Sequence, residues 1–397
     1  MHIVEPELVG LCSSRLARVT AALRRWVETG VLPGVAALIS RRGQVCYAEA
    51  LGQRDIAADL PMTLDTIVRI YSMTKPITSA ALMMLYEEGA FNLYDPVSRF
   101  IPAFKGIQVY SECGGVGHLA PAEREITVRD LLTHTAGLIY GGRDGAVDRL
   151  YQQAGIWDVN PEPTLAEWVA RLAKLPLAFQ PGARWQYSCA IDVLGYLIEV
   201  LSDRPFDVFL CERLFDPLGM SDTDFYAPPA SQPRFAKLYS PNAGGFVETD
   251  SLLGVRYDQP HPRMLGGAGL VSTISDYWRF AQLLLTGEFA GQRFLGRKTL
   301  ELMRANHLPA SLLPFSESPT TFHGYGFGLG GAVLLDIAAA QTPGSVGCFG
   351  WSGAASTDFW VDPVEDLTAL FITQVMPQPF GPINHEFRRL VYQALVE

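Results

Sequence analysis

The feature that most constrains the fold is strand-like sequence at both ends of the chain around a middle of helical sequence. Residues 35–40 and 45–50 are apolar runs joined by Arg41-Arg42-Gly43-Gln44, a pattern typical of a β-hairpin. Strand-like runs return in the C-terminal third, at 325–336, 346–351, 357–361 and 367–375. The two ends therefore predict one α/β domain, built from residues 1–98 and 266–397.

Helical patterns predict the remaining elements. An amphipathic helix over 13–30 presents Leu16, Val19, Leu23 and Trp26 on one side, and another over 382–395 closes the chain. Between about 92 and 265, shorter helical stretches alternate with loops rich in Pro, Gly and Asp, at 127–134, 164–174, 189–202 and 205–214. We therefore predict that residues 99–265 form a second, mostly helical domain.

Composition and charge exclude several classes of protein. The chain of 397 residues is 48% hydrophobic and 18% charged, with a formal net charge of −10 and no block of basic residues, so nucleic acid is not an expected partner. The six cysteines form no Cys-x-x-Cys pair and accompany no histidine cluster, so we expect reduced thiols, no metal and no cofactor. Neither a signal peptide nor a membrane span is recognisable, which predicts a soluble cytoplasmic protein without a membrane partner.

The clearest chemical signal is the run Ile70-Tyr71-Ser72-Met73-Thr74-Lys75-Pro76. Of the five lysines, only Lys75 has a serine three positions before it. At this spacing both side chains lie on one helix face, with their Cβ atoms about 5–6 Å apart. A desolvated lysine favours its neutral form and can relay a proton from a serine nucleophile. The alternative is a surface Ser-x-x-Lys without a function, because chance supplies roughly one or two per 400 residues.

Two further segments could complete such a site. Tyr187, in Phe179-Gln-Pro-Gly-Ala-Arg-Trp-Gln-Tyr187-Ser188-Cys189, is a candidate base beside a cationic lysine, although most tyrosines are packing residues. Gly350-Trp351-Ser352-Gly353-Ala354 lies between two apolar runs. Glycines there would let a substrate approach the backbone closely, and the alternative is a tight turn or bulge.

In order and spacing these elements resemble the serine β-lactamase and penicillin-binding superfamily. Its marks are Ser-x-x-Lys, then a tyrosine motif, then Lys-Thr-Gly or its replacement. Two more stretches are similar to those of the family, Leu131-Leu-Thr-His-Thr-Ala-Gly-Leu138 and Phe179-Gln-Pro-Gly182. The resemblance extends from about residue 15 to 395 and is strongest to the family VIII carboxylesterases, which are similar to class C β-lactamases.

The resemblance implies a role for each matching residue. Ser72 becomes the acylated nucleophile, Lys75 its proton partner and Tyr187 the general base. The backbone N–H groups of Ser72 and Ala354 become the oxyanion hole. The implied fold is α+β, of the β-lactamase/transpeptidase type: an antiparallel sheet flanked by helices, a mostly helical second domain, and the active site in the cleft between them. The family loop makes His134 a buried structural residue. Asp192 and Glu199, on the helix that follows Tyr187, are read as capping or interdomain contacts without a catalytic role.

Two departures from the class C pattern bear on the substrate. Trp351 stands where the family has the lysine that holds a substrate carboxylate, and Cys189 stands where it has an asparagine that binds a substrate amide. A thiol is a poor hydrogen-bond partner for an amide. Family VIII esterases often have the same tryptophan. We therefore predict a small-molecule neutral ester as the substrate, bound near Trp351, Ser352, Gly353 and Cys189.

The expected function is a serine carboxylesterase for short- to medium-chain esters, with weak cephalosporin hydrolysis in addition. Alternatives are an acyltransferase of the lovastatin-acyltransferase type, a class C-like β-lactamase, and a catalytically dead penicillin-sensing module. An α/β-hydrolase is disfavoured, because Gly350-Trp-Ser352-Gly-Ala354 lacks the last glycine of Gly-x-Ser-x-Gly and precedes a strand-like run.

Overall fold

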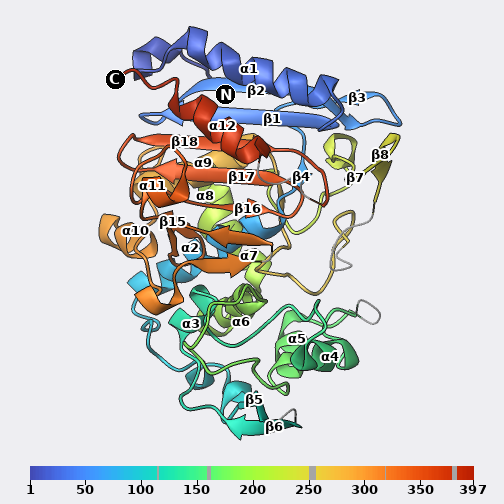
Figure 1. Cartoon of the computed structure of the whole chain (residues 1–397), viewed down its shortest axis with the longest axis vertical. Coiled ribbons are helices and arrows are strands. Elements are labelled where there is room, and N and C mark those ends of the chain that lie inside the picture. Colours follow the sequence, from blue (N-terminus) through green and yellow to red (C-terminus); the bar gives the residue numbers. More distant parts are fainter. Residues whose placement is uncertain (114–115, 159–161, 250–255, 318, 378–381) are drawn as a thin grey trace.

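The computed structural model describes residues 1–397 except 114–115, 159–161, 250–255, 318 and 378–381. Its centre is an antiparallel sheet of eight strands in the described residues. The strand order is β14 (Tyr325–Phe327), β15 (Ala332–Leu334), β16 (Phe349–Gly353), β17 (Thr357–Asp362), β18 (Leu367–Ile372), β1 (Gly34–Arg41), β2 (Gln44–Asp55) and β3 (Leu60–Pro61). The predicted sheet flanked by helices is confirmed (Figure 1).

The two ends of the chain meet inside this sheet. β1 pairs with β18, with Ala36 opposite Ile372, and the first hairpin turns through Arg42 and Gly43, whose φ angles are 53° and 72°. Two consecutive positive φ values are typical of the tight turn that matches strand twist. Near the termini the Cys12 N–H donates to the Ala394 carbonyl at 2.9 Å. Segments far apart in the sequence therefore form one layer.

Helices cover both faces of the sheet, which explains why β1 is buried at every position. Val35, Ala37 and Ile39 pack into one apolar cluster beneath α1 (Ser13–Glu28) and α12 (Pro382–Tyr392). Ala36 and Leu38 face the other cluster, which contains residues of α2 (Thr74–Glu87) and α9 (Ile274–Thr286). A strand buried on both faces reads as a continuous apolar run rather than an alternating one.

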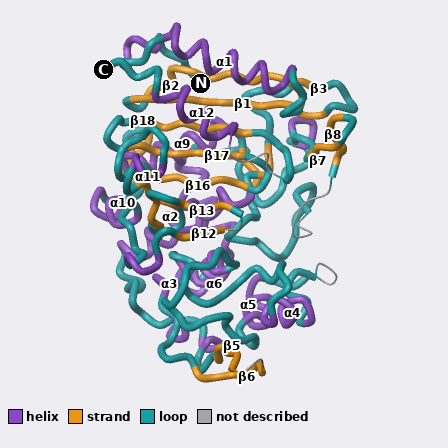
Figure 2. The backbone as a smooth tube through the Cα atoms, in the orientation of Figure 1, coloured by secondary structure: helices purple, strands orange, loops and turns teal. Residues whose placement is uncertain are grey.

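The middle of the chain supplies most of the lower part of the molecule, where helices and loops predominate (Figure 2). Its helices are α3 (Val128–Leu132), α4 (Ala146–Gln153), α5 (Leu165–Leu172), α6 (Ala190–Ser202), α7 (Phe206–Leu210) and α8 (Asp216–Leu218). It also contains the hairpins β5 (Gln108–Cys113) to β6 (Val116–Pro121) and β7 (Tyr239–Asn242) to β8 (Gly245–Glu248). The boundaries of a separate helical domain stay a prediction.

Several elements were not predicted from the sequence. The most important is α9, which packs against β17 and β18 and ends at Gly287 with φ 82°. Others are α4, α8, α10 (Arg297–Met303), α11 (Ile337–Ala340), β3, the hairpins above, β9 (Val271–Ser272), which pairs with β4 (Val68–Arg69), and the short pairs of β10 (Glu288–Phe289) with β11 (Gln292–Arg293) and β12 (Phe315–Glu317) with β13 (Thr320–Phe322). None of the helices in the described ranges is both long and apolar enough to cross a membrane.

Candidate active site

Ser72 lies in a single 3-10 turn, Tyr71–Met73, between the short strand β4 and helix α2. The turn begins with Tyr71 at φ 42°, a left-handed conformation that bulky residues rarely adopt. Such strain is typical of functional sites, where the surrounding structure maintains it. Ser72 is half-buried at the start of α2, where free N–H groups and the helix dipole favour negative charge.

Lys75, on the first turn of α2, is fully buried and makes three hydrogen bonds. Its Nζ lies 3.1 Å from Ser72 Oγ, 2.9 Å from the Tyr140 hydroxyl and 2.7 Å from the Gly267 carbonyl oxygen. The carbonyl can only accept, whereas either hydroxyl can donate or accept. A neutral Lys75 can therefore donate two protons and present its lone pair to the Ser72 hydroxyl.

Tyr187 lies beside this pair, as the sequence predicted, but it presents its ring to the lysine. Lys75 Nζ is 4.5 Å from the centroid of the Tyr187 ring, a cation–π distance. The Tyr187 hydroxyl accepts a hydrogen bond of 3.1 Å from the indole N–H of Trp351. Ser72, Lys75, Tyr187 and Trp351 thus come together, although their catalytic roles stay predictions.

Tyr140 is a site residue that the sequence did not indicate. Its hydroxyl contacts Lys75, its ring lies 5.5 Å from that of Tyr187, and its carbonyl accepts a 2.5 Å hydrogen bond from Trp157. Burial raises the pKa of Tyr140 well above the ordinary value, so the hydroxyl stays protonated. The available signal was its place two residues after Leu138, directly behind the segment that resembles the family loop.

His134 holds Tyr187 through both neighbours of that residue in the chain. The His134 carbonyl accepts from Gln186 N at 3.0 Å, and His134 Nδ1 lies 3.0 Å from Ser188 Oγ. The rings of His134 and Tyr187 are 4.9 Å apart. His134 is 1% exposed, and burial lowers its pKa well below the ordinary value. It is the buried residue that the sequence predicted, and it positions Tyr187.

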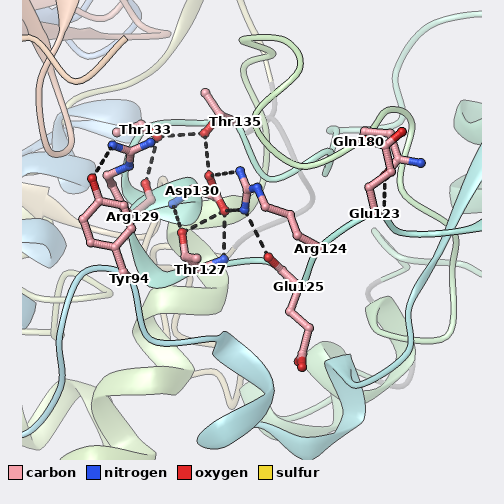
Figure 3. Close-up of polar contacts among 10 residues, drawn as sticks. All are labelled: Tyr94, Glu123, Arg124, Glu125, Thr127, Arg129, Asp130, Thr133, Thr135 and Gln180. Atoms are coloured by element: carbon pink, nitrogen blue, oxygen red, sulfur yellow. Dashed lines mark hydrogen bonds and ion pairs between the residues drawn. The ribbon is translucent and has the colours of Figure 1, made fainter. Parts of the chain in front are cut away.

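The loop that carries His134 is fixed by a buried carboxylate at the start of α3 (Figure 3). Asp130 accepts hydrogen bonds from Arg124 at 2.5 and 3.0 Å, from Thr127 N at 2.8 Å and from Thr135 Oγ1 at 3.2 Å. With the Thr127 side chain it forms a capping box. The Thr135 carbonyl in turn accepts from Gly182 N at 2.8 Å, which ties the loop to the segment leading to Tyr187.

Asp192 connects helix α6 to the residue that binds Lys75. Its Oδ1 accepts from Gly267 N at 2.7 Å, and the carbonyl of the same glycine accepts from Lys75. Burial raises the pKa of Asp192 to about 6, against the opposing charge of Lys75. Glu199 accepts from Phe206 N at 3.1 Å, at the start of α7. Glu199 thus caps α7, and Asp192 links α6 to the segment that contains Gly267. Whether the Asp192 contact joins two domains depends on boundaries that stay a prediction.

The predicted oxyanion segment lies against the turn of Ser72. A Cβ atom at Gly353 would lie 2.3 Å from the carbonyl oxygen of Ile70, so only glycine allows β16 to approach this closely. The next residue, Ala354, is partly buried. The oxyanion hole formed by the N–H groups of Ser72 and Ala354 stays a prediction. So does substrate contact by Ser352, which is half-buried on β16.

The predicted substrate-binding residues differ in placement. Trp351 stacks on Phe322 at 6.0 Å and is 9% exposed, so it forms part of an aromatic wall. Cys189 is 0% exposed, and its thiol donates to the Ile139 carbonyl at 3.2 Å. Its position therefore gives no support to the prediction that it contacts the substrate, because its sulfur faces the protein interior.

The described residues do not provide a ligand set for a metal ion. No group of three or more His, Cys, Asp or Glu residues that could hold a metal ion occurs in the described part of the chain. The titratable groups at the site are instead the serine, the lysine and the tyrosines. This set suits acyl transfer through a covalent serine intermediate.

Comparison with known proteins places the chain in a family. Residues 19–393 match the family model described as Beta-lactamase, so the chain belongs to the beta-lactamase family. It is 37% identical over 364 residues to uncharacterized protein MT1414 of Mycobacterium tuberculosis (strain CDC 1551 / Oshkosh), covering 90% of this chain and 89% of that protein. It is 31% identical over 399 residues to esterase EstB of Burkholderia gladioli, covering 96% of each.

A solved structure agrees with this assignment. The structure of EstCE1, described as a hydrolase with promiscuous acyltransferase activity, superposes with a TM-score of 0.82 at 29% identity. The match covers 96% of this chain and 99% of that one. The fold is the β-lactamase/transpeptidase-like fold, and these similarities support a hydrolase or acyl-transfer enzyme.

Proposed function

We propose that the protein is a serine carboxylesterase of the family VIII type, which hydrolyses short- to medium-chain esters through an acyl-enzyme on Ser72. The observation that carries the proposal is the 3.1 Å contact between Ser72 Oγ and the fully buried Lys75 Nζ. A buried lysine that contacts a half-buried serine at a helix start is arranged to activate that hydroxyl. The similarity to an esterase over nearly the whole chain supports it.

In the proposed reaction, Ser72 Oγ attacks the ester carbonyl carbon and its proton passes to the unit formed by Lys75 and Tyr187. The oxyanion is stabilised by the N–H groups of Ser72 and Ala354. The alkoxy C–O bond then breaks, and the alcohol leaves with the proton. Water attacks the acyl-enzyme in the second half, which releases the acid and restores Ser72.

A neutral ester suits the charges at this site better than an anionic one. The indole of Trp351 occupies the position where the class C pattern has a lysine, and its N–H is already used by Tyr187. A carboxylate without a partner in such a site costs several kcal/mol of desolvation. A neutral ester has no such cost and gains contact with the aromatic wall. We therefore propose slow β-lactam turnover beside ester hydrolysis.

Acyl transfer to an alcohol remains the second candidate, because it uses the same acyl-enzyme and differs only in the acceptor. The described acyltransferase activity of EstCE1 favours testing it. A butyryl ester assayed with and without an added alcohol separates the two. New ester formed at the expense of acid identifies a transferase, and acid release alone identifies a hydrolase.

The decisive experiment compares wild type, Ser72→Ala and Ser352→Ala on p-nitrophenyl esters of increasing chain length and on nitrocefin. We expect Ser72→Ala to lose several orders of magnitude in kcat, and Ser352→Ala to lose much less. Intact-protein mass spectrometry should detect an acyl adduct on wild type and on Ser352→Ala, but not on Ser72→Ala. A fully active Ser72→Ala enzyme would refute the proposal. Nitrocefin turnover as efficient as ester turnover would instead identify a β-lactamase.

A further inference from the structure

The hairpin β12–β13 lies against the wall of the proposed site through its aromatic residues. Phe315 on β12 and Phe322 on β13 stack with ring centroids 4.6 Å apart. Phe322 also stacks on Trp351, which hydrogen-bonds the Tyr187 hydroxyl. The last residue of β12 is Glu317. The hairpin therefore brings a carboxylate to the neighbourhood of the catalytic groups.

Glu317 is joined to the other side of the site by one ion pair. Its Oε1 accepts from Arg143 Nη2 at 2.8 Å. Arg143 lies in the loop between α3 and α4, which also contains Tyr140, the tyrosine that contacts Lys75. The other oxygen, Oε2, is buried and has no hydrogen-bond partner. Burial raises the pKa of Glu317, and the positive charges of Arg143 and Lys75 oppose the change. The charge of Glu317 therefore acts on Lys75 itself.

The two partners of the ion pair are not equally screened. The Glu317 side chain is 33% exposed and that of Arg143 52% exposed. Because water screens the more exposed charge more strongly, the charge of Glu317 is the less screened of the two and is not fully offset by Arg143.

We propose that Glu317 is a specificity-determining residue, whose negative charge excludes esters that carry a carboxylate. This inference rests on the proposed esterase function and names the substrate class more closely. A second negative charge brought near Glu317 is repelled, whereas a neutral ester is not. Trp351 supplies no cation that could offset the repulsion. The result is selection by charge at a site whose chemistry would accept both kinds of ester.

The test uses two pairs of esters that differ by one carboxylate. On the acyl side they are p-nitrophenyl valerate and mono-p-nitrophenyl glutarate. On the alcohol side they are 4-methylphenyl acetate and 4-acetoxybenzoate. The quantity measured is the ratio of kcat/KM for the neutral ester to kcat/KM for its anionic partner, after subtraction of the rate with Ser72→Ala. Intrinsic reactivity cancels when this ratio is compared between variants.

Two substitutions break the same ion pair but change the charge in opposite directions. Glu317→Gln removes the negative charge and should lower the ratio about three- to tenfold for at least one pair of esters. Arg143→Met leaves Glu317 without a counter-charge and should raise the ratio. If the ion pair mattered only as a link between the two loops, both variants would move the ratio in the same direction.

Glu248→Gln is the matched control. Glu248 is 53% exposed and forms an ion pair with Lys237, so the substitution also breaks an ion pair and changes the formal charge by one. It should leave the ratio unchanged. Added salt offers a measurement on wild type alone, because screening should lower the ratio as ionic strength rises.

Each result decides the inference. Opposite shifts for the two variants, together with a ratio that falls with salt, support it. An unchanged ratio in Glu317→Gln, or equal shifts in both variants, overturns it while Ser72-dependent turnover leaves the proposed function standing. Should Glu317→Gln fail to fold, Arg143→Met and the salt series decide. Absence of any Ser72-dependent ester turnover overturns the proposed function and this inference with it.

Discussion

At the scale of single residues, the site is defined by what surrounds one nitrogen atom. Lys75 Nζ is bound by a serine on its own helix turn, by Tyr140 65 residues away and by Gly267 192 residues away. The aromatic face of Tyr187 closes a further side. Because these groups share one proton donor and acceptor, they should act as a unit rather than as independent contributors.

This arrangement predicts strong non-additivity. Lys75→Ala and Tyr187→Phe should each lose several orders of magnitude in kcat, and the double variant should be little worse than either. Tyr140→Phe should be milder, because it removes one hydroxyl contact of Lys75 and leaves the others. Steady-state kinetics with p-nitrophenyl butyrate measure all four. Losses that add on a logarithmic scale would show separate roles. EDTA should change no rate.

At the scale of elements, two helices begin with the same capping box but differ in burial. On α3 the box uses Thr127 and Asp130, whose side chain is 1% exposed and paired with Arg124. On α5 it uses Thr164 with the exposed Glu167. The box on α3 fixes the loop that holds Tyr187. The hydrogen bonds of the box on α5 join only Thr164 and Glu167 to each other, and neither residue belongs to the candidate site.

We predict different consequences for the two caps. Asp130→Ala should cost roughly 1–3 kcal/mol of unfolding free energy, because it removes the buried acceptor of several hydrogen bonds and leaves their donors unpaired. It should also lower kcat, since the loop of His134 and Thr135 loosens. Thr164→Ala should cost about 1 kcal/mol and leave kcat unchanged. Urea denaturation and ester kinetics test both. Equal effects of the two substitutions would contradict the assignment.

Asp358, a half-buried carboxyl group on β17, should make the stability of the protein depend on pH. Burial raises the pKa of Asp358 to about 7 against the opposing charge of Arg388, whereas in the unfolded chain the group titrates near 4. The folded state therefore holds a proton that the unfolded state has released between about pH 4 and 7, so this group lowers the free energy of unfolding as the pH rises through that window. Asp358→Asn should flatten this slope in urea titrations. An unchanged profile would contradict it.

At the scale of the whole molecule, one face of the sheet packs against α1 and α12, and the other packs on the side of α2, α9 and the candidate site. Phe387 of α12 packs with Phe371 and Trp360 on the face covered by both termini. Phe280 of α9 packs on the other face against Tyr277, whose hydroxyl donates to the Met73 carbonyl at 2.9 Å beside Ser72. Each phenylalanine is almost fully buried.

Truncating each phenylalanine should therefore separate stability from activity. Phe387→Ala and Phe280→Ala should each cost roughly 3–5 kcal/mol through the cavities they leave. Only Phe280→Ala should also lower kcat, because α9 supports the turn of Ser72. Chemical denaturation and ester kinetics at a temperature where both variants are folded measure the two effects. A loss of kcat in Phe387→Ala equal to that in Phe280→Ala would contradict this division.

Local sequence pattern was sufficient to predict the elements at the two ends of the chain and part of the site. The first hairpin, α1 and α12 were predictable because their apolar spacing and turn residues act within a few positions. Ser72 and Lys75 were predictable for the same reason, since three residues of helix bring them together. Helix α9 and the short strands β5 to β13 gave no signal that was recognised, although α9 packs against β17 and β18 of the central sheet.

Tertiary structure alone decided the rest of the site. Sequence pattern named Tyr187 and Trp351 through resemblance, but the hydrogen bond between them joins residues 164 positions apart. It did not indicate that Tyr140 and Gly267 hydrogen-bond to Lys75. It predicted that Cys189 contacts the substrate, whereas the Cys189 sulfur faces the protein interior. Spacing along a helix or strand fixes contacts of near neighbours, whereas contacts across the molecule depend on how the packed elements meet.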